Sequence, residues 1–449
     1  MPYDIYALAN TAAERIQSTG RNTRFRVVSH YDADGITAAA VICKALYREG
    51  FDFHVTLMRN PFTQGIERIK EEGNTHIIFT DMGSGQLAMI KDIQAEILII
   101  DHHQLKQEKP PDHIFQINAN QCRINGNSEA CGASLAYAVA YALNKENIDL
   151  SRYALAGATG DKQYIGGFKG FNKTLVEQAI KHNVVSEHIG LKLSQPTISE
   201  GLYYSVEPYY KGLSGDYTAI EHLLKRLKIP GDTSYTHLPK DQQKQLHSAL
   251  MLHLIQQGCE SNILDTVIRT RYSSNQTYGE MEQFADLLDA CGKGGYRDLG
   301  LSLCLGDDNS YTQAKNHEQK FKKTLLAALQ EMDHNGVQET SSYRYFYTEE
   351  TSLGGVIGGI ATNFILDKEK PLLSIAKKAD ELHISCRGNH YLVQKGLDLG
   401  GAMNRVAATL QGHGGGHAIA AGATIPTEKE DQFIKEVELI LAKQLTFYS

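Results

Sequence analysis

The first 165 residues alternate short, continuous apolar runs with longer segments of helical periodicity. Apolar runs at 25–29, 51–58, 76–80 and 97–100 predict buried strands. Segments 36–50, 65–73 and 130–144 have the length and spacing of helices. Buried strands separated by helices are typical of a parallel sheet that helices cover on both faces. We therefore predict an α/β fold with a doubly wound parallel domain at the start of the chain.

The pattern changes after this region. Residues 169–227 are helical and more polar, and a segment rich in Gln, His, Lys and Asp follows. In that segment we expect amphipathic helices at 240–257 and 280–291, and a long charged helix at 311–333. Strand-like patterns return at 342–347, 372–377 and 382–387, with a helix at 355–366. We predict three parts: an α/β domain at 1–228, a mostly helical insert with a linking helix at 229–330, and a smaller α/β domain at 331–449.

Composition narrows the class of protein. With 42% hydrophobic and 22% charged residues, the 449-residue chain has the composition of a globular protein. The net charge of −7 argues against a protein coated in basic charge, although it leaves room for a local basic groove. The sequence contains no apolar run of ~18 residues, so we expect no membrane span. The N-terminus lacks the pattern of a secretory signal. Seven scattered cysteines without a C-x-x-C pair favour reduced thiols, so we expect a cytoplasmic protein.

Acidic side chains follow several of the predicted strands. They are Asp32 and Asp34 after the first, Asp81 after the third, and Asp101 after the fourth. We interpret the small-residue segment 154–160, which ends at Asp161, as one more strand end. The carboxyl ends of parallel strands meet at one edge of a sheet, where ligands bind, so these acids are expected to lie together. Asp32 and Asp34 are two residues apart, and in extended chain they would face the same side.

The negative charges of such a cluster must be balanced by positive charge, because neighbouring carboxylates repel and raise each other's pKa. A divalent cation supplies it, and a ligand set of Asp and His suits Mn²⁺, with Mg²⁺ as the alternative. Two ions ~4 Å apart that share a bridging carboxylate are suited to phosphoryl hydrolysis. Taken singly, each signal has an ordinary explanation: Asp81 as a helix N-cap, the adjacent histidines as surface residues. Their joint occurrence favours a metal site.

The motifs HYDADG, TDMG, DHH and TGD, in this order, resemble the four motifs of the DHH phosphoesterase superfamily. The resemblance implies that five residues bind metal: Asp32, Asp34, Asp81, His102 and Asp161. It implies that Asp81 bridges the two ions and is catalytic. It further implies that Asp101 orients the histidine pair and that His103 faces the scissile phosphate. His30, two residues before Asp32, is a further candidate ligand, although some branches carry their metal-binding histidine farther upstream.

The C-terminal segment HGGGHA resembles the glycine-rich signature of the DHHA1 substrate-binding domain. Glycines allow backbone N–H groups to approach an anion closely, which predicts a phosphate nest; the predicted phosphate-binding residues are His413, Gly414, Gly415, Gly416 and His417. Arg387, at the end of a predicted strand, matches the family's strand-end arginine and suits bidentate phosphate binding. The resemblance places the substrate in a cleft between the DHH and DHHA1 domains. Standing alone, the glycine segment would be an ordinary flexible loop.

Residues of the insert indicate which branch of the family the chain resembles. HYDADG, residues 284–292 (FADLLDACG) and residues 300–307 (GLSLCLGD) resemble archaeal RecJ-like proteins, some of which bind the GINS replication complex. The resemblance implies a two-metal exonuclease acting at an end of single-stranded DNA or RNA, in replication or repair, with GINS as a candidate partner. Two alternatives remain open. One is a phosphodiesterase for nanoRNA, cyclic dinucleotides or adenosine bisphosphate, and the other is a replication scaffold with weak activity.

Overall fold

The computed structural model describes residues 3–59, 62–105, 109–193, 197–274, 279–349, 351 and 353–446. The chain forms two compact units, and neither is continuous in sequence. The first unit comprises the residues up to Gly190 together with Arg269–Gln319, and the second comprises Leu191–Ile268 together with the residues from Lys320 on. This division does not follow the expected boundaries at 228 and 330, which stay a prediction.

The first unit is built on a parallel sheet, as the apolar runs predict. Its strand order is β2-β1-β3-β4-β5, and every pair is parallel; the strands are β1 (Arg24–His30), β2 (Asp52–Met58), β3 (His76–Thr80), β4 (Glu96–Asp101) and β5 (Ile114–Asn118). Strand β5 was not expected from the apolar pattern. Because β3 pairs with both β1 and β4, the three strand ends that carry acids are neighbours at one edge.

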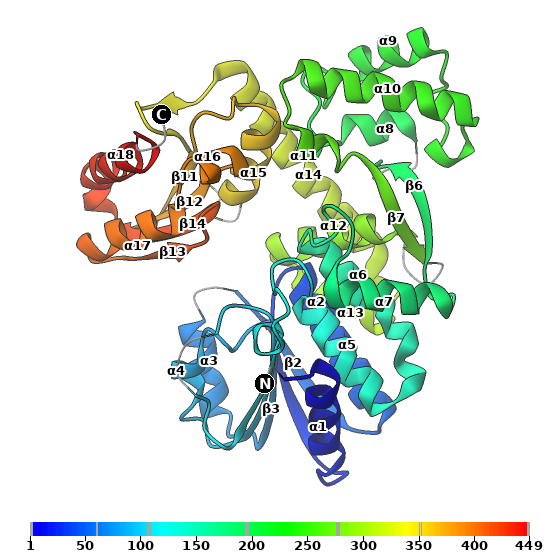
Figure 1. Ribbon diagram of the computed structural model, residues 1–449, viewed down its shortest axis with the longest axis vertical. Helices are drawn as coiled ribbons and strands as arrows, with labels where there is room; N and C mark the ends of the chain where they lie inside the picture. The colour runs from blue at the N-terminus through cyan, green and yellow to red at the C-terminus, as the bar shows by residue number, and fades with distance from the viewer. Residues whose placement is uncertain are drawn as a thin grey trace. The chain divides into compact units, whose positions relative to one another are not determined.

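Helices cover both faces of this sheet. Figure 1 shows α3 (Thr63–Glu71) and α4 (Leu87–Ile90) on one face, and α1 (Ile5–Gln17), α2 (Ala33–Arg48) and α5 (Gly132–Leu143) on the other. The buried strand residues alternate accordingly: Val28 and Phe79 belong to the α3 core, whereas Val27 and Ile78 belong to the α2 core. Four more helices enlarge the α2 core: α6 (Ser151–Gly160), α7 (Gly170–Lys181), α12 (Met281–Lys293) and α13 (Arg297–Leu305).

The second unit contains a six-stranded sheet with the order β13-β14-β12-β11-β10-β9, in which only β10 and β11 are parallel. Its strands are β9 (Gln338–Glu339), β10 (Arg344–Tyr347), β11 (Leu372–Lys378), β12 (Glu381–Arg387), β13 (His413–Gly416) and β14 (Ala420–Pro426). The accompanying helices are α15 (Gly354–Phe364), α16 (His390–Gln394), α17 (Leu399–Thr409) and α18 (Glu430–Thr446). Buried residues of α17 and α18 share one core with the sheet.

A helical region precedes this sheet in the chain and shares a core with α15. It contains α8 (Ile198–Tyr203), α9 (Tyr217–Leu227), α10 (Lys240–Gln256) and α11 (Ser261–Leu264). The segments that run between the units are β6 (Ser186–Leu191), β7 (Ile268–Ser274) and the long α14 (Ser310–Asn335); β6 and β7 form a small sheet with β8 (Gly279–Glu280). Short 3₁₀ turns lie at Ala119–Cys122, Lys145–Leu150, Tyr235–His237 and Thr427–Lys429. Among the described residues, no helix combines the length and the apolar character needed to cross a membrane.

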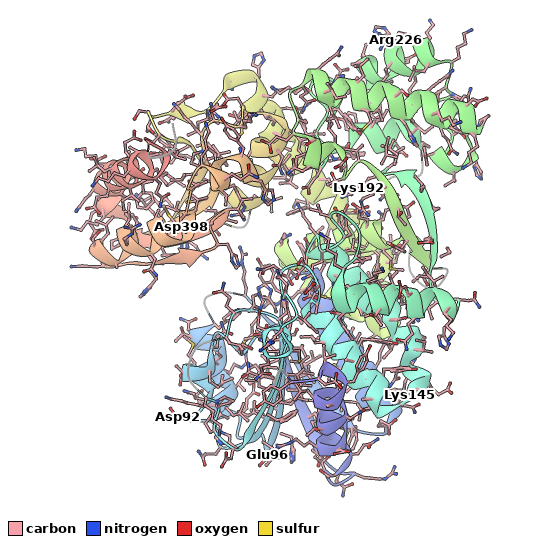
Figure 2. The ribbon with its side chains drawn as sticks, viewed as in Figure 1. Asp92, Glu96, Lys145, Lys192, Arg226 and Asp398 are labelled. Atoms are coloured by element: carbon pink, nitrogen blue, oxygen red, sulfur yellow. The ribbon has the colours of Figure 1, made fainter. Side chains whose placement is uncertain are left out.

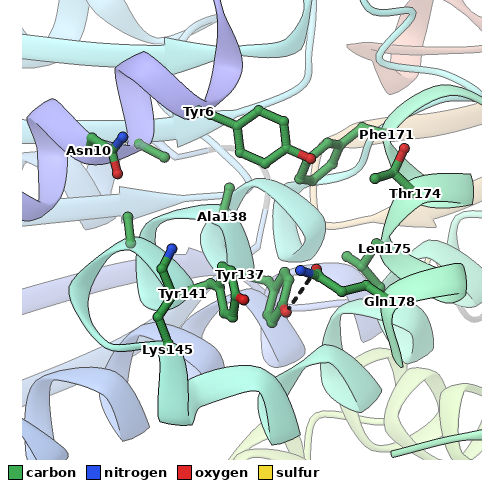
Figure 3. Close-up of a pocket in the computed structure, with 12 residues that line it drawn as sticks. Tyr6, Asn10, Tyr137, Ala138, Tyr141, Lys145, Phe171, Thr174, Leu175 and Gln178 are labelled. Atoms are coloured by element: carbon green, nitrogen blue, oxygen red, sulfur yellow. Dashed lines mark hydrogen bonds between the residues drawn. The ribbon is translucent and has the colours of Figure 1, made fainter. Parts of the chain in front are cut away.

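A pocket lies between α1, α5 and α7 (Figure 3), where Tyr6, Tyr137, Tyr141 and Phe171 form much of the wall. Its volume of about 160 Å³ is below the ~300 Å³ at which small-molecule sites begin. None of its lining residues belongs to the predicted site.

Candidate metal centre

The edge of the parallel sheet brings the predicted metal ligands together. His102 Nε2 lies 3.1 Å from Asp81 Oδ1, 3.5 Å from Asp161 Oδ2 and 3.7 Å from Asp34 Oδ2. On the other side of Asp81, His30 Nδ1 lies 2.9 Å from Asp32 Oδ2 and 3.5 Å from Asp81 Oδ2. Three groups of possible ligands result, each with its ligand atoms within 4.8 Å of one another: His30, Asp32 and Asp81; Asp34, His102 and Asp161; and Asp81, Asp101, His102 and His103, which overlaps both of the others. The two carboxylate oxygens of Asp81 face different groups.

Asp32 and Asp34 reach this site by a different route from the one expected. Asp32 has an extended backbone but is the N-cap of α2, and Asp34 already lies in the first turn of that helix. Asp32 accepts a hydrogen bond from Gly35 N at 3.0 Å. Asp34 accepts bonds from the first two N–H groups of α5, those of Gly132 at 2.6 Å and Ala133 at 2.9 Å. Two helix N-termini, rather than strand alternation, therefore hold the two carboxylates.

The interpretation of 154–160 as a strand end is wrong. These residues belong to helix α6, and Asp161 is its C-cap residue. A short run of small apolar residues does not distinguish a buried strand from a buried helix, and its alanines favour the helix. Asp161 is brought to the edge of the sheet because α6 packs against α2, α5 and α12.

Asp81 has an unusual backbone conformation. Its φ of 54° lies in the left-handed region, and its N–H donates to Ile100 O at 2.8 Å. Gly132 makes room for it, because a Cβ at Gly132 would lie 2.6 Å from the Asp81 Cβ. Asp81 is not a helix N-cap, since the next helix follows Gln86. A non-glycine residue in this conformation is uncommon, and such strain is concentrated at functional sites.

Asp101 holds the histidine pair in place. Its Oδ1 accepts bonds from His102 N at 2.8 Å and His103 N at 3.1 Å, and lies 2.7 Å from His103 Nδ1; its Oδ2 accepts from Ser84 N at 2.9 Å. His102 Nδ1 lies 2.5 Å from Gly126 O, to which it can only donate, so Nε2 is the atom free to face the carboxylates. The ring of His103 is half exposed.

Burial and crowding shift the protonation of this site. Burial, opposed by His102 and reinforced by Asp81, raises the pKa of Asp161 to about 7. Burial and repulsion from Asp81 and Asp161 hold the pKa of Asp34 well above its usual range. Burial lowers the pKa of both His102 and His30, but the carboxylates around them outweigh it and raise both values. Asp81 is buried too, yet its contacts with His102 and His30 lower its pKa. Protons thus balance the crowded acids, in positions where a cation would replace them.

We expect the metal-free protein to lose stability between pH 6 and pH 8. The raised pKa values of Asp161, His102 and His30 mean that the folded chain binds more protons here than the unfolded chain, so the free energy of unfolding falls as pH rises. At about 1.4 kcal/mol per proton and pH unit, the melting temperature should fall by several degrees. Differential scanning calorimetry in EDTA measures this trend, and Asp161→Asn should make it shallower. A melting temperature that rises over this range would contradict the expectation.

The residues predicted to bind phosphate lie in the second unit, where Arg387 and Gly416 share one end of the sheet and His413 lies at the other end of β13, opposite Thr424. Arg387 ends β12 opposite Ala420, and Gly416 ends β13 opposite Ala421. Arg387 is partly buried, and among the described residues no carboxylate forms an ion pair with it. His413 and His417 are exposed. Arg387 is therefore a cation that an anionic ligand could satisfy.

The alternative explanation of the glycine segment, an ordinary flexible loop, is wrong. Residues His413–Gly416 form the edge strand β13, which pairs with β14. Gly414 has a packing reason, since a Cβ there would lie 2.3 Å from Met403 O of α17, whereas a Cβ at Gly415 would meet no atom within 4 Å. Only the turn after the strand is irregular, where His417 N donates to Ala420 O at 2.8 Å. Any anion bound here would meet an edge strand and its turn.

Two family models match the chain. The DHH family N-terminal domain matches residues 24–160, and the DHHA1 domain matches residues 342–443. With the site described above, these matches show that the chain belongs to the DHH phosphoesterase superfamily, in its DHH–DHHA1 form.

Its relatives include an uncharacterized protein of Methanocaldococcus jannaschii, 29% identical over 94% of both chains. The single-stranded-DNA-specific exonuclease RecJ of Thermus thermophilus is 25% identical over 41% of this chain and 29% of its own. The solved structure of Thermus RecJ in complex with Mn²⁺ matches 97% of this chain and 55% of that chain, with a TM-score of 0.61 at 17% identity. CDC45 from Entamoeba histolytica matches 98% of both chains with a TM-score of 0.64 at 14% identity. This chain therefore spans less than two thirds of Thermus RecJ, and the two structural matches establish the fold.

The residues present fit divalent cations. Asp81 Oδ1 is buried and, although His102 Nε2 is 3.1 Å away, it has no aligned hydrogen bond from any residue that the structure describes. His30 Nδ1 is buried and unsatisfied in the same way. Buried polar atoms without partners are rare, and both point into a set of oxygen and nitrogen donors of the kind that binds Mn²⁺ or Mg²⁺.

Proposed function

We propose that this protein is a two-metal phosphodiesterase that removes nucleotides from an end of single-stranded DNA or RNA. The observation that supports it best is the position of Asp81, whose two oxygens face separate groups of ligands. We assign the first cation to His30, Asp32 and Asp81, and the second to Asp34, His102, Asp161 and Asp81. Mn²⁺ is the preferred ion, because imidazole and carboxylate ligands occur together.

The bound cations would lower the pKa of water and neutralise charge on the phosphate. The protein's part is to hold the donors still. Asp101 fixes His103 by its Nδ1, so Nε2, on the opposite edge of the half-exposed ring, is available to donate to a phosphate oxygen. The N-termini of α2 and α5 hold Asp32 and Asp34, so that little reorganisation is needed when charge develops. His103 and Asp81 are therefore assigned catalytic roles, with Asp101 positioning His103.

The nucleic-acid substrate and the partner are further parts of the proposal. The name of the Thermus relative supports single-stranded DNA as substrate, and the two DHH–DHHA1 family matches support a phosphodiester bond. GINS as a partner rests on the resemblance of residues 284–292 and 300–307. Co-elution of purified GINS with this protein would support it, and no binding by calorimetry would refute it.

Digestion of end-labelled oligonucleotides tests the function directly. Single-stranded DNA and RNA, labelled at either end, are incubated with Mn²⁺, and the products are resolved over time. Stepwise release of mononucleotides from a twenty-nucleotide strand supports an exonuclease and gives its polarity. A preference for two-nucleotide substrates would instead support the small-nucleotide phosphodiesterase. No cleavage of any substrate would support the scaffold.

Arg387→Ala should weaken substrate binding about 10- to 100-fold, as expected for the loss of a charge-assisted contact, and should change kcat much less. The matched control is Arg405→Ala, an exposed arginine on α17 of the same unit. Fluorescence anisotropy of a labelled strand, measured in Ca²⁺ to limit hydrolysis, gives the dissociation constant. Equal affinities of the two variants would remove Arg387 from the substrate site.

A further inference from the structure

Helix α12 places a pair of charged residues at the metal centre. Asp289 Oδ1 accepts a hydrogen bond from Ala33 N at 2.8 Å, and Asp289 Oδ2 pairs with Lys293 Nζ one turn further along the helix. Ala33 is the first residue of α2 and stands between Asp32 and Asp34. Asp289 and Ala33 are 256 positions apart in the sequence, so this contact is purely tertiary.

The backbone of α12 lies directly against the segment that precedes Asp32. A Cβ at Gly292 would lie 2.0 Å from Tyr31 O and 3.5 Å from Asp32 Cα, so only glycine fits there. The side chains of Asp289 and Lys293 are about three quarters buried, at 24% and 25% exposure. Both belong to, or directly follow, the FADLLDACG stretch, for which the proposed mechanism gives no role.

The hydrogen bond to Asp289 gives the first N–H of α2 an acceptor. The N–H of the first helical residue has no partner within its own helix, and the Asp32 side chain already accepts from Gly35. Asp289 satisfies that N–H from outside and so fixes the helix end from which Asp32 and Asp34 project. A second carboxylate beside Asp32 would be repelled by it, and Lys293 supplies the compensating charge.

We propose that Asp289 and Lys293 are positioning residues of the metal centre: Asp289 anchors the N-terminus of α2, and Lys293 keeps Asp289 in place beside the ligand Asp32. This inference rests on the proposed metal-dependent function. Residues that orient metal ligands typically contribute about 10- to 100-fold to metal affinity. The pair should therefore act on the affinity for Mn²⁺ rather than on the fold.

The test is calorimetric titration of metal-free protein with Mn²⁺. Asp289→Ala and Lys293→Met should weaken Mn²⁺ binding about 10- to 100-fold. Asp289→Asn keeps an oxygen that can accept from Ala33 N, so it should lose less Mn²⁺ affinity than Asp289→Ala. Lys293→Arg keeps the positive charge, so it should lose less Mn²⁺ affinity than Lys293→Met. The control is the pair Lys173→Met and Glu177→Ala, an exposed ion pair with the same four-residue spacing on α7, which should bind Mn²⁺ like the unaltered protein.

A second readout separates positioning from general destabilisation. The Mn²⁺ concentration for half-maximal hydrolysis should rise in parallel with the dissociation constant, while kcat at saturating Mn²⁺ recovers. Unchanged Mn²⁺ affinity in both Asp289→Ala and Lys293→Met, with normal binding by the unaltered protein, would overturn the inference and leave the proposed function standing. An unaltered protein that binds no Mn²⁺ would overturn both.

Discussion

Replacing Asp81 by asparagine should reduce phosphodiester hydrolysis by about 10³-fold or more, because both proposed cations lose the carboxylate that they share. Asparagine is the appropriate substitution: it preserves the shape of the side chain, and it tolerates the left-handed backbone found at this position better than alanine does. Initial rates on a labelled single strand measure the loss. Calorimetry should show weaker binding of Mn²⁺ and fewer ions bound per chain.

The control is Asp92→Asn, an exposed acid of the first unit in the turn between α4 and β4 (Figure 2), so it precedes the start of β4, whereas Asp101 is the last residue of that strand. It should retain full activity. Circular dichroism and the melting temperature should show that both variants fold. Activity of Asp81→Asn within a few-fold of the unaltered protein would exclude the bridging role.

Removal of divalent metal should have an effect of the same size. After dialysis against EDTA, hydrolysis should fall by about 10³-fold or more, because water is then a poor nucleophile and the phosphate charge is not neutralised. Added Mn²⁺ should restore the rate, and Mg²⁺ should restore part of it. The affinity for Mn²⁺ should rise from pH 6 to pH 8, because the ligands must lose the protons that burial and crowding retain.

Two observations would contradict this expectation. One is full activity in EDTA, with metal absent by elemental analysis. The other is a stoichiometry of one ion per chain in the fully active protein, which would refute the second group of ligands.

The sequence predicts the central part of this molecule well, for a physical reason. Strands β3 and β4 are buried on both faces, so each contains an unbroken apolar run, and the predicted parallel sheet is confirmed. Acids that follow such runs must lie at the carboxyl edge. Asp81 and Asp101 could therefore be placed there without a structure.

Other features depend on contacts that a local pattern does not contain. The segment before Asp161 has the same small residues that a buried strand could have, and only packing against α2, α5 and α12 shows why it is helical. The contact between Asp289 and Ala33 N could not be predicted, because the two residues lie 256 positions apart in the sequence. The His413–Gly416 strand was hidden because glycine is a poor strand former, and its pairing with β14 is what orders it.

The interleaved connectivity of the two units has a consequence for how such a protein can be divided or recombined. The chain passes between the units three times, at Gly190, Ile268 and Gln319. A gene fragment that ends at Gly190 encodes every proposed metal ligand but omits α12, whose residues fill part of the α2 core. The first unit therefore cannot be transferred by a single crossover or isolated by a single truncation. An exchange between relatives would have to carry the residues up to Gly190 and the segment Arg269–Gln319 together. Deletion of the expected insert at 229–330 would remove the second of these segments from the first unit.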